Sequence, residues 1–311
     1  MKPKVDLTLI RKPAYLSPSA LKMYRADVEK YFSTYLAIER PPRFPQTKPM
    51  AVGSGFDAYV KADLSHRYGA AKPYDFDTLY NDQVEVGMRD LVRADSLHCW
   101  ESYKNSGALH GLYRLLDRSS SVSFETRLDG VISHGNSSVT LCGIPDMLFT
   151  IDDLDVIFDW KVNGYYSKAS PKAGYAHLYP DGIHHKDCYL LDHYGIKCNA
   201  AWFNDLYDEW AMQLTTYSWL GGLPVGNRQL CMLHQLAWDS RSGSVRVAEH
   251  SGLINPAYQL ALYEEYVALW QSLQDNTLLP ASQVERLNRE AQTMMGSSIE
   301  DTTYREMCRG Q

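Results

Sequence analysis

The pattern of hydrophobic positions divides the chain into a helical first part and a strand-rich second part. Apolar residues recur at three-to-four spacing over residues 17–38, where Ser17 can cap a helix that starts at Pro18. A second helix is predicted over 50–64, and residues 76–116 are mainly helical in pattern. The proline-rich stretch at 40–49 separates the first two helices.

Strand patterns begin at residue 121. Three segments rich in β-branched and aromatic residues are separated by Gly, Asn, Ser and Asp-Asp turns, which predicts a three-stranded meander over 121–132, 137–150 and 155–162. A long Tyr-, His- and Lys-rich connection then runs over 163–204, and loops of that length are usually functional or mobile.

The rest of the chain predicts a helix, a strand, a closing helix and a polar tail. The ranges are 205–220 (ended by Gly221 and Gly222), 228–238, 256–274 and the residues after 280. This order indicates one α/β domain with a helical elaboration at its front. We expect residues 1–120 to be a helical part packed on a core of 121–280, with 281–311 a peripheral tail.

Composition is that of an ordinary globular protein, with 45% hydrophobic and 22% charged residues among 311. No stretch approaches the roughly 20 apolar residues that span a bilayer, and the apolar run at the start is too short for a signal sequence. We therefore expect a cytoplasmic protein with no membrane partner.

Charge is distributed unevenly along the chain. Residues 1–50 hold ten Lys/Arg against four Asp/Glu, a local +6, although the whole chain carries −6. A basic arm on an acidic body suggests an anionic partner for the arm and a cation for the body. Many acidic proteins also have a basic end without such a partner.

The six cysteines are scattered and contain no Cys-x-x-Cys pair, which argues against a disulfide framework and an iron–sulfur cluster. One group comes closest to a zinc site, but its spacing matches no standard zinc finger. The group consists of His184, His185, Cys188, His193 and Cys198.

The segment 141–162 reads as a hairpin that turns at Asp152 and Asp153. A two-residue turn there pairs positions whose numbers add up to 305, so Asp146 falls opposite Asp159. Strand alternation then places Asp159 and Lys161 on one face of the sheet, with Phe158 and Trp160 on the other.

Two like charges directly across a strand pair destabilise it unless a cation offsets them. Mg²⁺ prefers carboxylate oxygens and waters, and Mn²⁺ could substitute for it. Mg²⁺ held by two carboxylates and waters is the usual arrangement for phosphate chemistry. Lys161 could then orient the water that attacks the phosphate and stabilise the negative charge that develops on it. A solvated strand edge with an Asp–Lys pair is the alternative, although the apolar neighbours Val156 to Phe158 indicate a buried strand.

Gly143-Ile144-Pro145-Asp146 followed by Asp159-Trp160-Lys161 resembles the signature of the PD-(D/E)xK nuclease superfamily, in the branch with RecB-like domains and phage recombination exonucleases. Three further segments are similar to motifs of that branch, and together the resemblance covers about residues 15–240. They are Ser17-Pro18-Ser19-Ala20-Leu21 at the first helix, Gly53-Ser54-Gly55-Phe56-Asp57 where relatives have Gly-x-x-x-His, and Gln213-Leu-Thr-Thr-Tyr217.

The resemblance implies a restriction-endonuclease-like core, a central mixed sheet flanked by helices, and a Mg²⁺-dependent DNA nuclease. The resemblance also implies that Asp146 and Asp159 bind the metal ion and that Lys161 is the catalytic lysine. Asp57 stands where relatives have a histidine ligand, and it either binds the ion as a carboxylate or faces water. Glu125 either serves a second metal ion or a water, or is an ordinary strand-end carboxylate.

Gln213 and Tyr217 share a helix face, which in relatives borders the DNA; a buried Tyr and a solvated Gln is the other interpretation. The connection after Lys161 interleaves rings that can stack on bases with lysines that can meet phosphates, and the same residues could form a solvated loop. Those with a predicted DNA contact are Tyr165, Tyr166, Lys168 and Lys172.

The sequence leaves three functions open. The first is an exonuclease acting in phage-type recombination, replication or DNA degradation, and the others are an endonuclease and a catalytically idle DNA- or protein-binding factor. A phage recombination protein or a second copy of the chain are the partners considered besides DNA. Strand polarity and the preference for single or double strands are not indicated.

Overall fold

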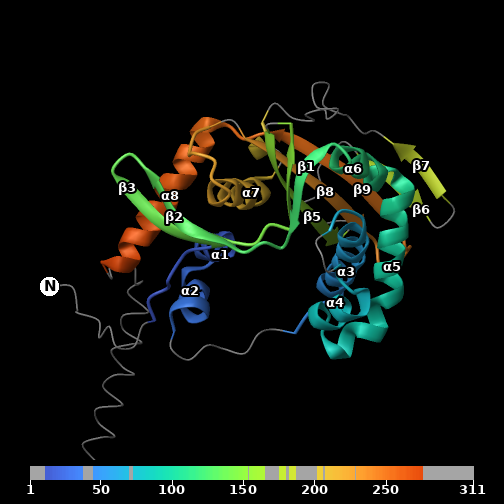
Figure 1. Cartoon of the computed structure of the whole chain (residues 1–311). Coiled ribbons are helices and arrows are strands. Elements are labelled where there is room, and N and C mark those ends of the chain that lie inside the picture. Colours follow the sequence, from blue (N-terminus) through green and yellow to red (C-terminus); the bar gives the residue numbers. More distant parts are fainter. Residues whose placement is uncertain are drawn as a thin grey trace, which may run out of the picture.

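A mixed β-sheet with helices on both faces forms the centre of the computed structural model (Figure 1). The structure describes residues 11–37, 45–69, 73–152, 154–164, the backbone of 175–179 and 182–186, and residues 202–205, 207–227 and 229–275. In this part of the chain no helix is long and apolar enough to cross a membrane.

The helices group before and after the strand-rich segment. Their bounds are α1 Pro18–Ala26, α2 Val28–Tyr31, α3 Lys48–Tyr68, α4 Phe76–Gln83, α5 Arg89–Ser106, α6 Ala108–Leu116, α7 Asp208–Leu220 and α8 Pro256–Gln274. A π-helical turn at Phe32–Leu36 and 3-10 turns at Val86–Met88 and Phe203–Asp205 complete the helical structure of the described residues.

The strands of the described residues are β1 Ser119–Phe124, β2 Leu128–His134, β3 Ser137–Gly143, β4 Met147–Ile151, β5 Leu154–Gly164, β6 Tyr175–Tyr179, β7 Gly182–Lys186, β8 Leu230–Trp238 and β9 Val245–Leu253. Among these the sheet order is β1-β4-β5-β8-β9, extended at its β9 edge by the β6–β7 hairpin, while β2 and β3 form a separate pair. Strands β5 and β8 are parallel and the other neighbours are antiparallel.

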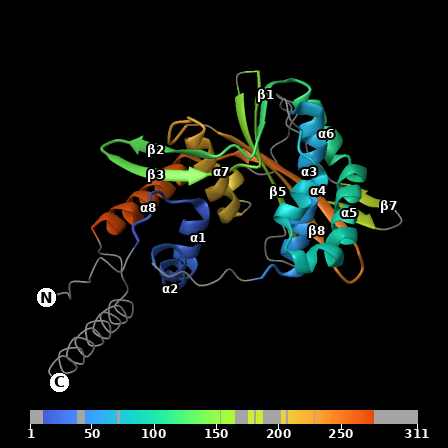
Figure 2. The same cartoon turned by 60° about the horizontal axis from the view of Figure 1, so that its bottom comes forward.

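The two faces of the sheet bury different helices. Phe158 and Trp160 of β5 lie in one core with α3, α5 and α6, whereas Ile157 lies in another with α7. Figure 2 shows the same division, with α3 to α6 on one side of the sheet and α7 and α8 on the other. A third core joins α1, α8 and the β2–β3 pair. This arrangement confirms the predicted mixed sheet flanked by helices, with helices at the front of the chain.

The prediction of one continuous helix over 17–38 is wrong. The chain is extended at Asp27 (φ −162°, ψ 103°), whose side chain accepts a hydrogen bond from the Lys30 backbone N–H at 2.9 Å. Asp at this position caps a new helix, so α1 ends and α2 begins there. Residue 38 lies outside the described residues.

The predicted three-stranded meander is also wrong. Two of its three segments each split into two strands, so that 121–132 contains the end of β1 and the start of β2, and 137–150 contains β3 and the start of β4. Glu125 adopts a left-handed conformation (φ 46°) and interrupts the first segment. Pro145 interrupts the second because it has no N–H to donate to a sheet.

The second half of the chain matches the expected elements more closely. Helix α8 has the predicted bounds, and α7 and β8 begin within three residues of the expected positions. The connection over 163–204 is not irregular throughout, since β6 and β7 lie in it, and β9 was not predicted. The candidate DNA-contact residues Tyr165, Tyr166, Lys168 and Lys172, the Cys/His group and the tail 281–311 lie outside the described residues or side chains.

Candidate active site

The hairpin register predicted from the sequence is confirmed. Ile151 pairs with Leu154, Phe149 with Val156 and Met147 with Phe158, and each pair of numbers adds up to 305. Asp146 comes directly before β4 and so lies opposite Asp159 at the open end of the hairpin. This placement follows from the two-residue turn, where Asp152 adopts the left-handed conformation (φ 56°) that such turns require.

Asp146 is held in place by the neighbouring strand. Its Oδ2 accepts a hydrogen bond from the Trp160 backbone N–H at 3.0 Å. Its carboxyl group also lies within hydrogen-bonding reach of Asp159, whose side chain is almost completely buried. Two carboxyl groups therefore meet across the β4–β5 pair, with one of them excluded from bulk water.

Lys161 neutralises part of this charge. Its Nζ lies 2.6 Å from Asp159 Oδ2, and its side chain is 24% exposed. The contact confirms that residues 159 and 161 share a face of β5, as strand alternation requires. Lys161 also lines the adjoining cavity.

Helix α3 contributes a second pair of charges, one member of which the sequence analysis missed. Lys61 Nζ lies 2.5 Å from Asp57 Oδ2, 2.5 Å from Glu125 Oε1 and 3.8 Å from Asp146 Oδ1. The i,i+4 spacing of Asp57 and Lys61 predicts their contact. Glu125, from the end of β1, has a place at the site in one interpretation of the sequence, but no sequence pattern indicates its contact with Lys61.

These charged side chains line one cavity of about 360 Å³. Its walls come from α3, the residue after β1, the residue before β4, and the middle of β5, so segments far apart in sequence meet there. The sequence-predicted residues that it brings together are Asp57, Glu125, Asp146, Asp159 and Lys161.

Burial and mutual repulsion shift the acidity of the aspartates. Burial, and then the charge of Asp146, raise the pKa of Asp159 well above its ordinary value. Burial and the same neighbour raise the pKa of Asp57 to about 7. Burial opposes ionisation of Asp146 too, but its hydrogen bond with Asp159 and the nearby Lys61 hold its pKa below the ordinary value.

These opposed shifts show that positive charge is needed if both members of the Asp146–Asp159 pair are to be ionised. The donor set is made of oxygen atoms, which suits a hard divalent cation such as Mg²⁺. In the described part of the chain, however, no three His, Cys, Asp or Glu side chains are grouped so that they could hold a metal ion. Two carboxylates completed by waters fit Mg²⁺, and Asp146 with Asp159 supplies them.

Helix α7 borders the other side of the aspartates. Gln213 Nε2 donates a hydrogen bond to the Tyr217 hydroxyl at 2.8 Å, so the two residues share a face, as their spacing predicts. Tyr217 is 7% exposed, and burial followed by the charge of Asp159 raises its pKa. Their predicted contact with DNA stays a prediction.

Gly143 lets α7 approach this closely. A Cβ atom at residue 143 would lie 2.4 Å from Tyr217 Cε1, which is closer than any real contact. Two residues of the segment 143–146 therefore have identifiable structural roles. Gly143 makes room for the Tyr217 ring, and Pro145 ends the strand pairing just before Asp146.

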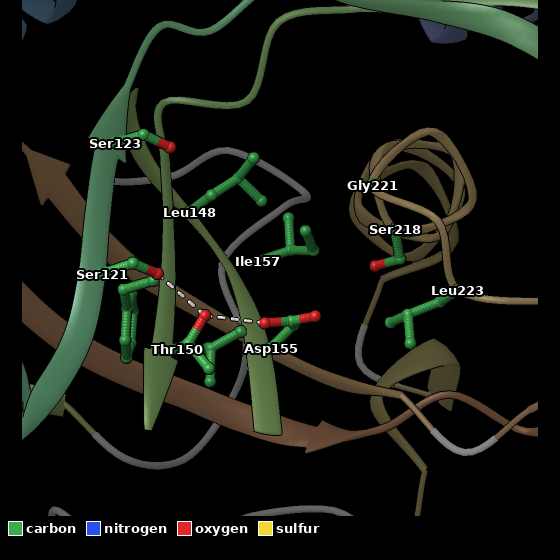
Figure 3. Close-up of a pocket in the computed structure, with 11 residues that line it drawn as sticks. Ser121, Ser123, Leu148, Thr150, Asp155, Ile157, Ser218, Gly221 and Leu223 are labelled. Carbon is green, nitrogen blue, oxygen red and sulfur yellow. Dashed lines mark hydrogen bonds between the residues drawn. The ribbon is translucent and has the colours of Figure 1, made fainter. Parts of the chain in front are cut away.

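A second cavity, of about 220 Å³, lies between the β1–β4–β5 strands and the end of α7 (Figure 3). Its hydroxyl groups satisfy one another, since Thr150 Oγ1 lies 2.9 Å from Ser121 Oγ and donates to Asp155 Oδ1 at 2.7 Å. It contains none of the charged residues that line the candidate site.

Comparisons with known proteins assign no family to the chain. No family model matches it, and no curated protein matches it. Among solved structures, the chain is similar to one described as the crystal structure of SSO0001, with a TM-score of 0.29 and 12% sequence identity over 81% of this chain and 84% of that one. A TM-score of this size carries no argument about fold or function.

Proposed function

We propose that this protein is a Mg²⁺-dependent DNA nuclease, and more specifically an exonuclease, built on a restriction-endonuclease-like core. Three observations support it: Asp146 opposes Asp159 across one hairpin, Lys161 contacts Asp159, and the three line one open cavity. The meeting of the two carboxyl groups beside the ammonium carries the proposal, because they are the groups that phosphodiester hydrolysis with a divalent cation needs.

Asp146 and Asp159 would hold the ion. When bound, Mg²⁺ would supply positive charge for the phosphodiester group and increase the acidity of the attacking water. Lys161 would orient that water through its ammonium and stabilise the negative charge that develops on the phosphate oxygens. Asp57 and Glu125 contact Lys61. They could bind a metal ion only if these ion pairs with Lys61 were broken.

DNA is the partner that the charges and α7 support. Tyr217 and Gln213 border the aspartates on the side opposite α3, where the nucleotide next to the cleaved bond would lie. The basic residues at the start of the chain would add contacts to the phosphates, which are independent of base sequence. In this proposal the protein acts in the cytoplasm on phage or host DNA.

Cleavage of end-labelled linear DNA and closed circular DNA, each with Mg²⁺, Mn²⁺ or no divalent ion, tests the proposal. We expect shortening of the linear substrate from its ends and an intact circle, and no reaction without the ion. Asp159→Asn and Lys161→Met should each lower the rate by at least about 100-fold, because each removes a group that acts on the transition state.

Asp155→Asn is the matched control, because Asp155 lies on the same strand as Asp159 but outside the candidate site, beside Thr150. It should cut as fast as the wild type. Equal rates for the wild type and Asp159→Asn would identify a contaminating nuclease and overturn the proposal. A nicked or linearised circle would replace the exonuclease by an endonuclease.

A catalytically idle DNA-binding factor is the second candidate. It is favoured by the pairing of Lys61 with Asp57 and Glu125, which leaves two carboxylates engaged with an ammonium instead of an ion. An idle factor should retard DNA in a gel without cutting it at any concentration of Mg²⁺ or Mn²⁺.

A further inference from the structure

Lys61 is an unusual lysine because its side chain is 3% exposed although it is charged. Lysine side chains are almost never this buried unless they are paired. Among the described residues, the lysine–carboxylate pairs outside the site have far more exposed side chains, such as Lys104 with Glu101 at 38% and 47%. Burying Lys61 therefore requires partners that make up for lost water.

Its partners come from three separate elements. Asp57 lies one turn earlier on α3, Glu125 follows β1, and Asp146 precedes β4. The left-handed backbone of Glu125 is uncommon for a residue with a side chain, and its backbone N–H donates to the Asp146 carbonyl at 3.2 Å. The surrounding fold thus holds three carboxylate oxygens around one ammonium nitrogen.

Charge in the site is balanced in a particular way. Four carboxylates and two ammonium groups line the cavity, which leaves two negative charges when all are ionised. One divalent cation cancels those two charges, whereas a second would leave the site with a net charge of +2. Without Lys61 the cavity lining would carry three net negative charges, and one divalent cation would no longer cancel them.

We propose that Lys61 is a resident cation that occupies the place of a second metal ion, so that this site takes only one divalent cation, between Asp146 and Asp159. Its ammonium pairs with both Asp57 and Glu125, cancels one of their two negative charges and holds these carboxylates away from the ion. Lys61 is a positioning residue, since it acts through these carboxylates and contacts no substrate. This inference rests on the proposed nuclease function and specifies the metal content of the same site.

The number of Mn²⁺ ions bound per chain tests the inference directly, without an activity measurement. Titration of the full chain with Mn²⁺, followed by electron paramagnetic resonance of the free ion, should give one bound ion. Asp159→Asn should lose it. Two ions bound by the wild type would overturn the inference, and this count needs no variant at Lys61.

Lys61→Met removes the ammonium but keeps a side chain of similar length. It frees Asp57 and Glu125, so the variant should bind two Mn²⁺ ions. The double variant Lys61→Met/Glu125→Gln loses one positive and one negative charge together, and should return to one ion because a ligand of the second is gone. Lys104→Gln, at an exposed pair, should bind one ion like the wild type.

The outcomes separate this inference from the function on which it rests. A wild-type chain that binds two ions and cuts DNA keeps the nuclease and rejects the role of Lys61, as does a folded Lys61→Met variant that still binds one ion. A wild-type chain that binds no Mn²⁺ and cuts no DNA rejects both. One ion in the wild type and two in Lys61→Met would support the inference.

Discussion

Behind the candidate site, Tyr103 connects two elements through a single hydroxyl group. Trp160 Nε1 donates to the Tyr103 oxygen at 3.2 Å, and that oxygen lies 2.5 Å from His234 Nδ1. The indole N–H donates to the tyrosine oxygen, and the hydrogen between that oxygen and His234 Nδ1 belongs to one or the other group according to the tautomer of the histidine. Burial lowers the pKa of His234 to about 3, so its ring is neutral at pH 7. Trp160, whose backbone N–H also holds Asp146, is fixed from both sides.

Tyr103→Phe should lower the free energy of unfolding by roughly 1–3 kcal/mol, because it leaves the buried Trp160 indole N–H and the buried His234 Nδ1 without their partner. Denaturant unfolding followed by fluorescence would measure this. Tyr31→Phe is the matched control, since its buried hydroxyl has no hydrogen-bond partner among the residues that the structure describes. It should be neutral or stabilising, and an equal loss in both variants would contradict the assigned hydrogen bonds.

Two buried histidines predict how stability depends on pH. Burial lowers the pKa of His250 from 6.5 to about 4, and burial together with His250 lowers that of His234 to about 3. A depressed folded-state pKa means that the unfolded chain binds more protons below pH 6.5. The stabilisation is therefore complete above pH 6.5 and is lost as the pH falls toward 4.

His250→Gln should remove one part of this dependence and keep a donor for Gln235, whose Oε1 lies 3.1 Å from His250 Nε2. Between pH 6 and 4.5 the free energy of unfolding of the wild type should fall more steeply than that of the variant, by about 1.4 kcal/mol per pH unit. Urea unfolding at several pH values measures both slopes. Parallel slopes would show that His250 is protonated in the folded state.

At the scale of elements, α3 shows how closely the front helices pack. A Cβ atom at Gly55 would lie 2.3 Å from Ser96 Oγ of α5 and 2.9 Å from Tyr80 Cε2 of α4. At Gly53, on the same helix, the nearest atom would be Val162 Cβ at 3.5 Å, an ordinary contact. The two glycines therefore have different functions, although they are only two residues apart.

Gly55→Ala should destabilise the protein by about 1–3 kcal/mol because α3, α4 and α5 must move apart. Gly53→Ala should be neutral or stabilise it by about 0.5–1 kcal/mol, because alanine loses less conformational freedom in a helix than glycine. Thermal unfolding of both variants gives the comparison. Similar melting temperatures would show that the α3–α5 contact is looser than described.

At the scale of the whole molecule, the candidate site joins the helical front of the chain to the sheet. Asp57 and Lys61 lie on α3, whereas Asp146, Asp159 and Lys161 belong to the β4–β5 hairpin. A ligand of this site that does not bind the unfolded chain stabilises all these elements together. The effect on stability is independent of catalysis.

Mg²⁺ should therefore raise the melting temperature of the wild type, by an amount that corresponds to about 2.7 kcal/mol when the ion is present at about 100 times its dissociation constant. Removal of the ion with EDTA should reverse the shift. In Asp159→Asn the shift should be absent. For each protein, the melting temperature with Mg²⁺ is compared with that of the same protein without it. An equal shift in Asp159→Asn would place the bound ion elsewhere in the molecule.

Much of the core was predictable because it depends on local patterns. The bounds of α8 follow from a capping Asn255, a proline at the first position and helical spacing, and those features act within a few residues. Failures occurred where a single residue interrupted a pattern, as Glu125, Pro145 and Asp27 do. The strand β9 was missed because Glu249, His250 and Gly252 make its sequence too polar to be recognised as a strand.

The sequence by itself determined that Lys161 shares a face of its strand with Asp159, because side chains alternate along a strand. It also predicted that Asp146 meets Asp159, on the assumption of a two-residue turn that the pairing of Ile151 with Leu154 confirms. Only the tertiary structure decided that Lys61 meets Glu125 and that β5 pairs in parallel with β8. Those contacts join residues 64 or more positions apart in the chain. They depend on how whole elements pack, and no local period carries that information.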